Sequence, residues 1–266
     1  MRNLFSIIIL LFSVHLANAQ SYYLMPATFF PEKGGQTQID VYYGKGFDTT
    51  KARKTPVSQL AAAFLYNGKK PMNLLPDNKD NKSFLPLSVN DNGLYLIAVK
   101  KTSHLLNIER EELQDEFSDD GFGELASKLE DKDEFNIDEI FTAKTLVMAE
   151  KPSGNYYSEK SADELEIVLE QNPYKMQYGE DLTAQVLLHG KPVSKVRAEV
   201  YTRGLNGTIF ISEFTSDEDG KLYIKLNRTG EWMIKVVQIL PSKDKDNAKG
   251  PDFRRWSASY SFGFKS

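Results

Sequence analysis

The chain has 266 residues, a formal net charge of −4 and no cysteine. Without cysteine the protein cannot form disulfides, thiolate metal sites, cysteine nucleophiles or thiol redox centres, so its stability must come from apolar cores. The mild negative charge also argues against nucleic acid as a partner, because phosphate binding normally needs clustered basic residues.

The first residues have the pattern of a secretory signal peptide. Arg2 precedes an apolar run at 4–14, and Ala17-Asn18-Ala19 supplies an A-x-A cleavage site. We therefore expect 1–19 to be removed before Gln20, which places the mature protein in the periplasm or outside the cell. The apolar run is shorter than the about 20 residues that a membrane-spanning helix needs, and no second run follows. No transmembrane segment is expected in the mature chain, and no lipid anchor, because the cleavage site has no lipobox cysteine.

Residues 20–150 are predicted to form an N-terminal β-sandwich. Within 38–43, Ile, Val and Tyr recur with the period of two that indicates a half-buried strand. The run 94–99 is apolar almost throughout, which is typical of a strand in the middle of a sandwich. The run 141–149 has similar character, and we interpret it as a final or edge strand of the same sandwich.

An acidic segment interrupts this first sandwich. Between Asn107 and Glu139, fourteen residues are acidic and three are basic, and apolar residues recur at near-helical spacing. The pattern predicts a helical insertion at 104–139, made of two short amphipathic helices broken at 119–123. Its charges most simply form a solvated face. A surface that collects cations or docks a partner is the alternative, because like charges that repel need a reason to stay together.

The rest of the chain is predicted to form a second sandwich. The stretch 151–164 is polar and turn-rich, and we interpret it as a linker. Residues 165–266 contain short β-runs separated by turns, including the Asp-Gly turn of 216–221, which is typical of a hairpin. The predicted fold class is therefore all-β: two β-sandwich domains of immunoglobulin or transthyretin type, with a short acidic α-helical insertion in the first.

Several short motifs resemble a known family of secreted proteins. They are Tyr-Leu-Met-Pro at 23–26, Gly-Gly-Gln-Thr at 34–37, Asn-Pro-Tyr at 172–174, Tyr-Gly-Glu-Asp-Leu at 178–182 and Thr-Gly-Glu-Trp at 229–232. Together they resemble the domain-of-unknown-function 4198 family over nearly the whole mature chain. The resemblance implies an exported two-domain β-protein, some of whose relatives are grouped with nickel and cobalt uptake as a periplasmic component.

The metal ligands of that family are not all present. Its members usually carry histidine at the mature N-terminus and in the penultimate strand, where this chain has Tyr22-Tyr23 and Gln238. Tyrosine and glutamine are poor ligands for nickel or cobalt. The candidate metal ligands are therefore His104 and His189, the two histidines that follow the leader, and a divalent ion is implied by the resemblance alone. Each histidine has an alternative interpretation as an exposed surface residue, with His189 in a turn.

The aromatic residues offer a different candidate site. Tyr22, Tyr23 and Trp256 are a candidate recognition surface, because aromatic residues are enriched in the cores of interfaces. The sequence has no nucleophile elbow, P-loop, H-E-x-x-H motif or dinucleotide fingerprint, so we do not expect an enzyme.

The sequence leads to three functional hypotheses. The first is an exported, non-enzymatic binding protein, an accessory periplasmic component of nickel or cobalt uptake that acts with an envelope transporter. The alternative is a structural or adhesive envelope module, or a protein associated with an outer-membrane receptor, with no small-molecule ligand. A carbohydrate-binding domain is a third hypothesis, since the aromatic residues permit it.

Overall fold

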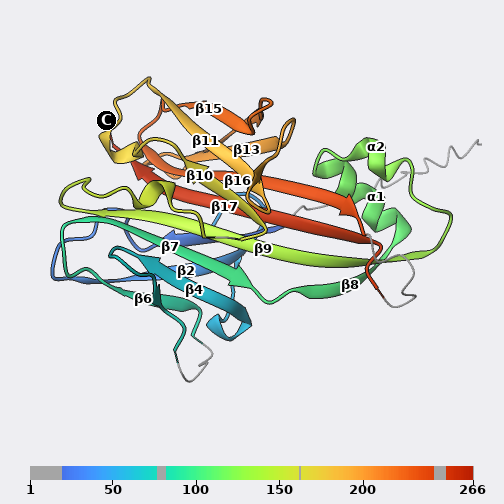
Figure 1. The fold of residues 1–266 in the computed structure, drawn as a ribbon, viewed down its shortest axis with the longest axis horizontal. Helices are drawn as coiled ribbons and strands as arrows, with labels where there is room; N and C mark the ends of the chain where they lie inside the picture. Colours follow the sequence, from blue (N-terminus) through green and yellow to red (C-terminus); the bar gives the residue numbers. More distant parts are fainter. Residues whose placement is uncertain (1–19, 77–81, 162, 243–249, 266) are drawn as a thin grey trace, which may run out of the picture.

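The computed structural model describes residues 20–76, 82–161, 163–242 and 250–265. The predicted signal peptide, 1–19, lies outside the described residues. The chain is mostly β-strand, and a long nine-stranded sheet runs through the middle of the molecule between two four-stranded sheets (Figure 1). The predicted all-β, sandwich-like fold is confirmed. Within the described ranges, no helix is both long and apolar enough to span a membrane.

Three sheets contain all of the described strands. The central sheet has the order β14 (Ile209–Thr215), β13 (Arg197–Arg203), β16 (Gly230–Pro241), β17 (Phe253–Phe264), β9 (Glu134–Ala149), β7 (Gly93–Lys101), β4 (Leu60–Tyr66) and β5 (Met72–Asn73), and β8 (His104–Glu109) also pairs with β9. The N-terminal small sheet contains β1 (Ser21–Pro26), β2 (Gln36–Gly44), β3 (Arg53–Lys54) and β6 (Phe84–Ser88). The C-terminal small sheet contains β10 (Leu165–Leu169), β11 (Asp181–Leu188), β12 (Lys191–Pro192) and β15 (Lys221–Lys225).

The central sheet joins the two predicted sandwiches. β17 pairs in parallel with β9, in a register that runs from Phe253 opposite Ile137 to Phe262 opposite Leu146. The strands of 20–150 and those of 165–266 therefore share one hydrogen-bonded sheet. The predicted division into two sandwich domains is not confirmed, because the central sheet crosses the predicted boundary.

The alternation of side chains lets the same strands serve both faces of this sheet. Tyr260 and Phe262 of β17 lie in the apolar core beneath the C-terminal small sheet. Ser259 and Ser261 point the other way, and their hydroxyls donate to the carbonyl oxygens of Tyr22 and Leu24 in β1 at 2.8 and 2.7 Å. The two small sheets thus cover opposite faces. Strands buried on both faces are apolar almost throughout, as the sequence of β7 is.

The acidic insertion is less helical than predicted. Only α1 (Arg110–Asp119) and α2 (Gly123–Ala126) are α-helical, while β8 and the first residues of β9 form an antiparallel pair from His104 to Glu139. The prediction of a helical insertion over all of 104–139 is therefore wrong at both ends. Near-helical spacing is a local signal, and the pairing of β8 with β9 overrides it by burying Ile108, Phe135 and Ile137 in a core that includes α1.

A buried ion pair lies where the predicted linker crosses the sheet. The Lys144 ammonium on β9 contacts a Glu166 carboxylate oxygen on β10 at 2.7 Å, and the two side chains are 3% and 2% exposed. Lys144 also donates to the carbonyl oxygens of Glu159 and Ile167 at 3.0 and 3.3 Å. The linker supplies one of these acceptors, the Glu159 carbonyl oxygen, and so covers the pair. It also contains a three-residue 3-10 helix at Tyr156–Ser158. Two further 3-10 turns lie at Val57–Gln59 and Pro173–Lys175.

Candidate functional site

The predicted recognition residues are buried. Tyr22 is 6%, Tyr23 0% and Trp256 4% exposed. Tyr22 and Tyr23 belong to β1, which pairs with β2 and packs against β17 and β9 of the central sheet, and their rings contact Phe141 and Tyr42 at 4.7 and 5.4 Å between centroids. These residues therefore stabilise the core and do not form a recognition surface in this conformation. The aromatic density of the N-terminus reflects a strand with both faces covered.

Burial changes the ionisation of Tyr22 and gives a testable pH dependence. Burial, followed by the charge of neighbouring Tyr43, raises the pKa of Tyr22 from 10.0 to about 12. A raised pKa means that the neutral phenol stabilises the fold below the unfolded pKa, and this contribution is lost as the pH rises through the folded pKa. In Tyr22→Phe, the fall in unfolding free energy between about pH 10 and 12 should be shallower by up to about 2 to 3 kcal/mol.

Urea denaturation of the wild type and Tyr22→Phe across this pH range measures the difference. The variant keeps the ring and its packing, so any constant difference in stability can be separated from the pH-dependent part. Parallel curves for the two proteins would contradict the assignment. Tyr178→Phe, at a side chain that is 61% exposed, is the matched control.

The two candidate histidines lie on opposite faces of the central sheet. His104 is opposite Glu139 in the pairing of β8 with β9, and directly opposite residues point to the same face. Trp256 is opposite Ile140, one position further along β9, so its ring points to the other face. His189 contacts that ring at 5.9 Å between centroids. The fold therefore does not bring His104 and His189 together.

A cleft lies between the end of β2 and the edge strand β14, and we call it the β2–β14 cleft. Its volume is about 670 Å³, and its apolar surface comes from Tyr43, Phe47, Tyr201, Ile209 and Ile211. Phe47 is fully buried against Tyr23, with 5.5 Å between ring centroids. Ile211, in contrast, is 60% exposed. The cleft thus has a fixed aromatic floor and an open aliphatic edge.

Glycines allow the chain to approach the cleft wall closely. Gly46 has a φ of +66°, and a Cβ there would lie 3.1 Å from the Tyr201 ring. A Cβ on Gly44 would lie 2.7 Å from the Cβ of Ala52. The Gly-Lys-Gly-Phe motif at 44–47 therefore shapes the cleft, because both glycines fit where a side chain would not.

The rim of the cleft is basic. Lys45, Lys51 and Arg53 line it and are exposed, and the Arg53 guanidinium lies 5.4 Å from the centre of the Tyr43 ring. The one lining carboxylate is Asp48, whose pKa is lowered mainly because the Thr50 hydroxyl donates to it at 2.6 Å. Three cations and one carboxylate give the rim a net positive charge. Such a site suits a ligand that combines an anionic group with an apolar body.

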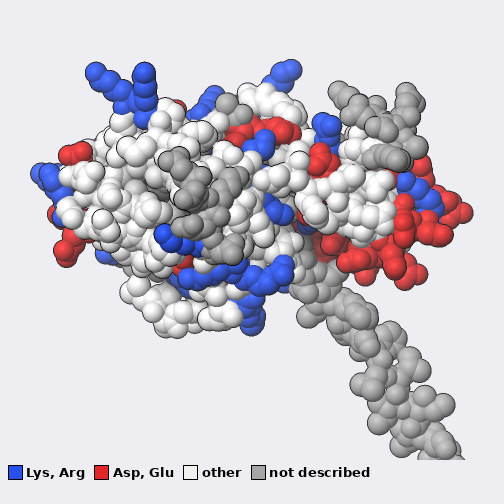
Figure 2. Space-filling model, turned by 90° about the horizontal axis from the view of Figure 1, so that it is seen from below, with Lys and Arg blue, Asp and Glu red and all other residues white. Residues whose placement is uncertain are grey.

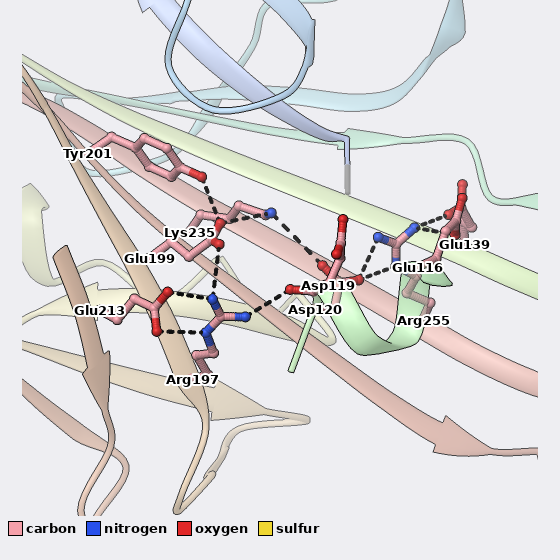
Figure 3. Close-up of polar contacts among 10 residues, drawn as sticks. All are labelled: Glu116, Asp119, Asp120, Glu139, Arg197, Glu199, Tyr201, Glu213, Lys235 and Arg255. Carbon is pink, nitrogen blue, oxygen red and sulfur yellow. Dashed lines mark hydrogen bonds and ion pairs between the residues drawn. The ribbon is translucent and has the colours of Figure 1, made fainter. Parts of the chain in front are cut away.

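A buried ionic network attaches α1 to the central sheet beside this cleft (Figure 3). Arg255 of β17 donates to Asp120 at 2.6 Å and to Glu139 at 2.8 Å, and it contacts Glu116 at 3.4 Å. The side chains of Arg255 and Asp120 are 4% and 1% exposed. Burial alone would lower the pKa of Arg255, but Asp120 and Glu139 raise it above its ordinary value. Burial raises the pKa of Glu116, although Arg255 opposes this shift.

The network continues to the wall of the cleft. Lys235 contacts Asp120 at 4.0 Å and Glu199 at 3.1 Å, and the Tyr201 hydroxyl donates to Glu199 at 2.7 Å. Arg197 donates to the carbonyl oxygen of Asp119 at 2.8 Å (Figure 3). Tyr201, which forms part of the cleft wall, is thus linked through Glu199 and Lys235 to Asp120, the residue that follows α1.

The carboxylates of the acidic segment therefore fall into an inward group and an outward group. Its inward carboxylates, Glu116, Asp120 and Glu139, pair with a buried cation. Figure 2 shows the outward carboxylates gathered at the end of the molecule that carries α1 and α2, with a separate band of Lys and Arg nearer the middle of the same face. Sequence reasoning missed Lys235 and Arg255. A charge inside an otherwise buried strand was the available signal.

Several solved structures show some likeness to the chain. A tetra-tandem repeat of a large adhesion protein is 8% identical with a TM-score of 0.22, and the match covers 91% of this chain and 48% of that one. Three domains of the bacteriophage RB49 Hoc protein are 9% identical with a TM-score of 0.22, covering 93% and 71%. The D0-D1 domain of intimin is 12% identical with a TM-score of 0.20, covering 92% and 98%. At these scores the likeness carries no functional argument.

The chain spans about half the length of the adhesion-protein structure that it matches, 48%. No curated protein matches the sequence. The family model of a domain of unknown function, DUF4198, matches residues 17–239, a range that contains all the motifs on which the resemblance rests. The chain therefore belongs to the DUF4198 family.

Proposed function

We propose that this is an exported, non-enzymatic binding protein whose recognition site is the β2–β14 cleft. The proposal rests on one observation: an opening of about 670 Å³ combines an aromatic floor with three exposed cations. Concave, mostly apolar sites with a few charged groups are the usual form of ligand sites. Export is inferred from the leader pattern at 1–19, and the partner is expected in the cell envelope, as a transporter or an outer-membrane receptor.

The cleft chemistry selects an anionic, apolar ligand or side chain. Tyr43 and Tyr201 offer ring surface, while Lys51 and Arg53 carry charges that stay exposed to solvent. Exposed charges add specificity and speed association more than they add affinity, so most of the affinity would come from apolar burial.

The nickel or cobalt role implied by the family resemblance stays a prediction. Within the described ranges, no group of three or more His, Cys, Asp or Glu side chains is arranged to hold a metal ion. A nickel or zinc site also needs several imidazole or thiolate ligands. The two candidate ligands, His104 and His189, lie on opposite faces of the central sheet. The β2–β14 cleft, in contrast, has an aromatic floor and a basic rim, which suit a ligand with an anionic group and an apolar body.

Titration with 1-anilinonaphthalene-8-sulfonate tests the proposal, because this fluorophore combines a sulfonate with an aromatic body. We expect saturable fluorescence enhancement by the folded protein. Lys51→Glu and Arg53→Glu should each weaken binding about tenfold, equivalent to about 1.4 kcal/mol. Ile211→Asp should weaken it similarly by placing a carboxylate at the open edge. All three positions are exposed, so the variants should fold.

Lys175→Glu is the control, since it reverses an exposed charge outside the lining of the cleft. It should bind the fluorophore like the wild type. Equal affinity of all variants would place the fluorophore elsewhere and overturn the cleft proposal. No binding by the wild type would favour the alternative hypothesis, a structural or adhesive envelope module without a small ligand.

A further inference from the structure

The cleft opens onto an exposed edge of the central sheet. β14 (Ile209–Thr215) pairs in regular register with β13 on one side and has no partner strand in the described part of the chain on the other. Four consecutive residues, Phe210 to Glu213, are exposed. Alternate backbone N–H and C=O groups of such a strand point outwards and can accept another strand.

β14 lacks the features that usually protect an edge strand. Proteins protect edges with very short strands, lysine, proline or bulges. Several other edge strands have these features: β5 has two residues, β6 contains Pro86, and β15 begins and ends with lysine. β14 has seven residues, no lysine, no proline and no bulge, and its one charged side chain, Glu213, is paired with Arg197 of the neighbouring strand. An unprotected edge beside a ligand-type cleft indicates a site for strand addition.

The two faces of β14 present different chemistry to an added strand. Ile209 and Ile211 point into the basic-rimmed cleft, and Glu213 lies on the same face, where Arg197 pairs with it. Phe210 and Phe214 point to the other face, where Phe214 packs against the core beneath the C-terminal small sheet and Phe210 is 40% exposed. Side chains of an added strand would alternate in the same way, because neighbouring strands share their pleat. Acidic residues would fit the cleft face beside Ile209 and Ile211, where the basic rim lies, and apolar residues would fit the phenylalanine face.

The charges disfavour a second copy of the chain as the occupant. Pairing two β14 edges about a two-fold axis would bring the basic rims of two clefts onto one face of the joined sheet. Lys45, Lys51 and Arg53 of both copies would then repel one another. An acidic segment neutralises the same cations, so charge complementarity favours a different polypeptide.

We infer that β14 binds an extended segment of an envelope partner by strand addition, and that this segment alternates acidic and apolar residues. The inference rests on the proposed function, since the acidic side chains enter the β2–β14 cleft. It differs in requiring backbone hydrogen bonds along the edge, as in other cases of strand addition. The cleft selects for acidic side chains, and the exposed edge of β14 forms the backbone hydrogen bonds with the added strand.

A labelled heptapeptide, acetylated and amidated, with the sequence Glu-Val-Glu-Phe-Glu-Val-Glu is the probe, because its length equals that of β14. Fluorescence anisotropy should show saturable binding that weakens with added salt. Two N-methylated forms of the peptide keep its side chains but lose ladder donors, one with the methyl groups on its internal glutamate amides and the other with them on its valine and phenylalanine amides. The glutamate amides face β14 in an antiparallel complex and the valine and phenylalanine amides in a parallel one, because the outward backbone groups of β14 belong to the residues that point into the cleft. One of the two forms should bind about tenfold more weakly or worse, and a lysine-for-glutamate peptide should not bind.

Protein variants and hydrogen exchange locate the complex. Lys51→Glu, Arg53→Glu and Ile211→Asp should weaken peptide binding, and Lys175→Glu should not. Amide exchange should slow in β14 when the peptide is added. Equal affinity for both N-methylated peptides and the unmethylated one, or no peptide binding by a protein that binds the fluorophore in its cleft, would overturn strand addition and leave the cleft proposal intact.

Loss of both fluorophore and peptide binding would overturn both proposals. Concentration-dependent dimerisation of the protein without peptide, with slowed exchange in β14, would show that a second copy occupies the edge. That outcome would overturn the inference of a different, acidic partner.

Discussion

Replacing Arg255 by leucine is expected to lower the free energy of unfolding by about 3 to 5 kcal/mol, the range for removing one partner of a buried ion pair. The guanidinium is the shared partner of Asp120, Glu139 and Glu116. Leucine fills part of the volume but leaves two nearly buried carboxylates without their main cation. Urea denaturation followed by circular dichroism measures the loss.

The effect of Arg255→Leu should be greatest in and around α1. Arg255 joins the strand β17 to Asp120, the residue that follows α1, so hydrogen exchange should accelerate at 110–126 more than in β9. Arg110→Leu is the matched control, because its partner Asp131 is fully exposed. It should cost at most about 1 kcal/mol. A similar small loss for both variants would show that the network contributes little to stability.

Replacing Lys144 by methionine is the second large expected effect, again about 3 to 5 kcal/mol. Methionine retains the apolar stem, but Glu166 then stays buried, and its remaining donor among the described residues is Ser161, chiefly through the backbone N–H at 2.9 Å. The carbonyl oxygens of Glu159 and Ile167 also lose their contacts with the ammonium. Chemical denaturation provides the measurement.

A second substitution separates charge from packing. Lys144→Met combined with Glu166→Leu removes both charges, and replacing a buried pair by apolar residues is often neutral or stabilising. The double variant should therefore be more stable than Lys144→Met alone. Lys128→Met, at an ion pair with Glu124 whose side chains are 67% and 85% exposed, should change stability by less than about 1 kcal/mol. A double variant as unstable as the single one would attribute the loss to packing.

The two ionic clusters have different structural roles. Lys144 and Glu166 join the central sheet to the C-terminal small sheet beneath the linker. The network around Arg255 lies on the opposite face, where it holds the helix and, through Lys235 and Glu199, the Tyr201 wall of the β2–β14 cleft. Arg255→Leu should therefore also loosen the cleft, whereas Lys144→Met should not.

The sequence by itself determined the secondary structure of most of the chain. Period-two alternation at 38–43 and the apolar run 94–99 correspond to β2 and β7, and the Asp-Gly turn at 216–221 connects β14 to β15. The hairpin predicted at this turn is wrong, because β14 pairs with β13 whereas β15 pairs with β11 in a different sheet. These signals are local, since a strand with one covered face and a tight turn each depend on neighbouring residues. The family motifs could also be identified from the sequence alone, because most of them are short turn sequences.

Only the tertiary structure decided how these strands share their cores and where the candidate site lies. The parallel pairing of β17 with β9 joins residues more than a hundred positions apart, and no periodicity encodes which strand becomes a neighbour. That pairing buries Tyr22 and Tyr23, separates His104 from His189 and places Arg255 beside Asp120. The cleft likewise combines the glycine turn after β2 with β13 and β14, so its basic rim and apolar floor exist only once the chain has folded.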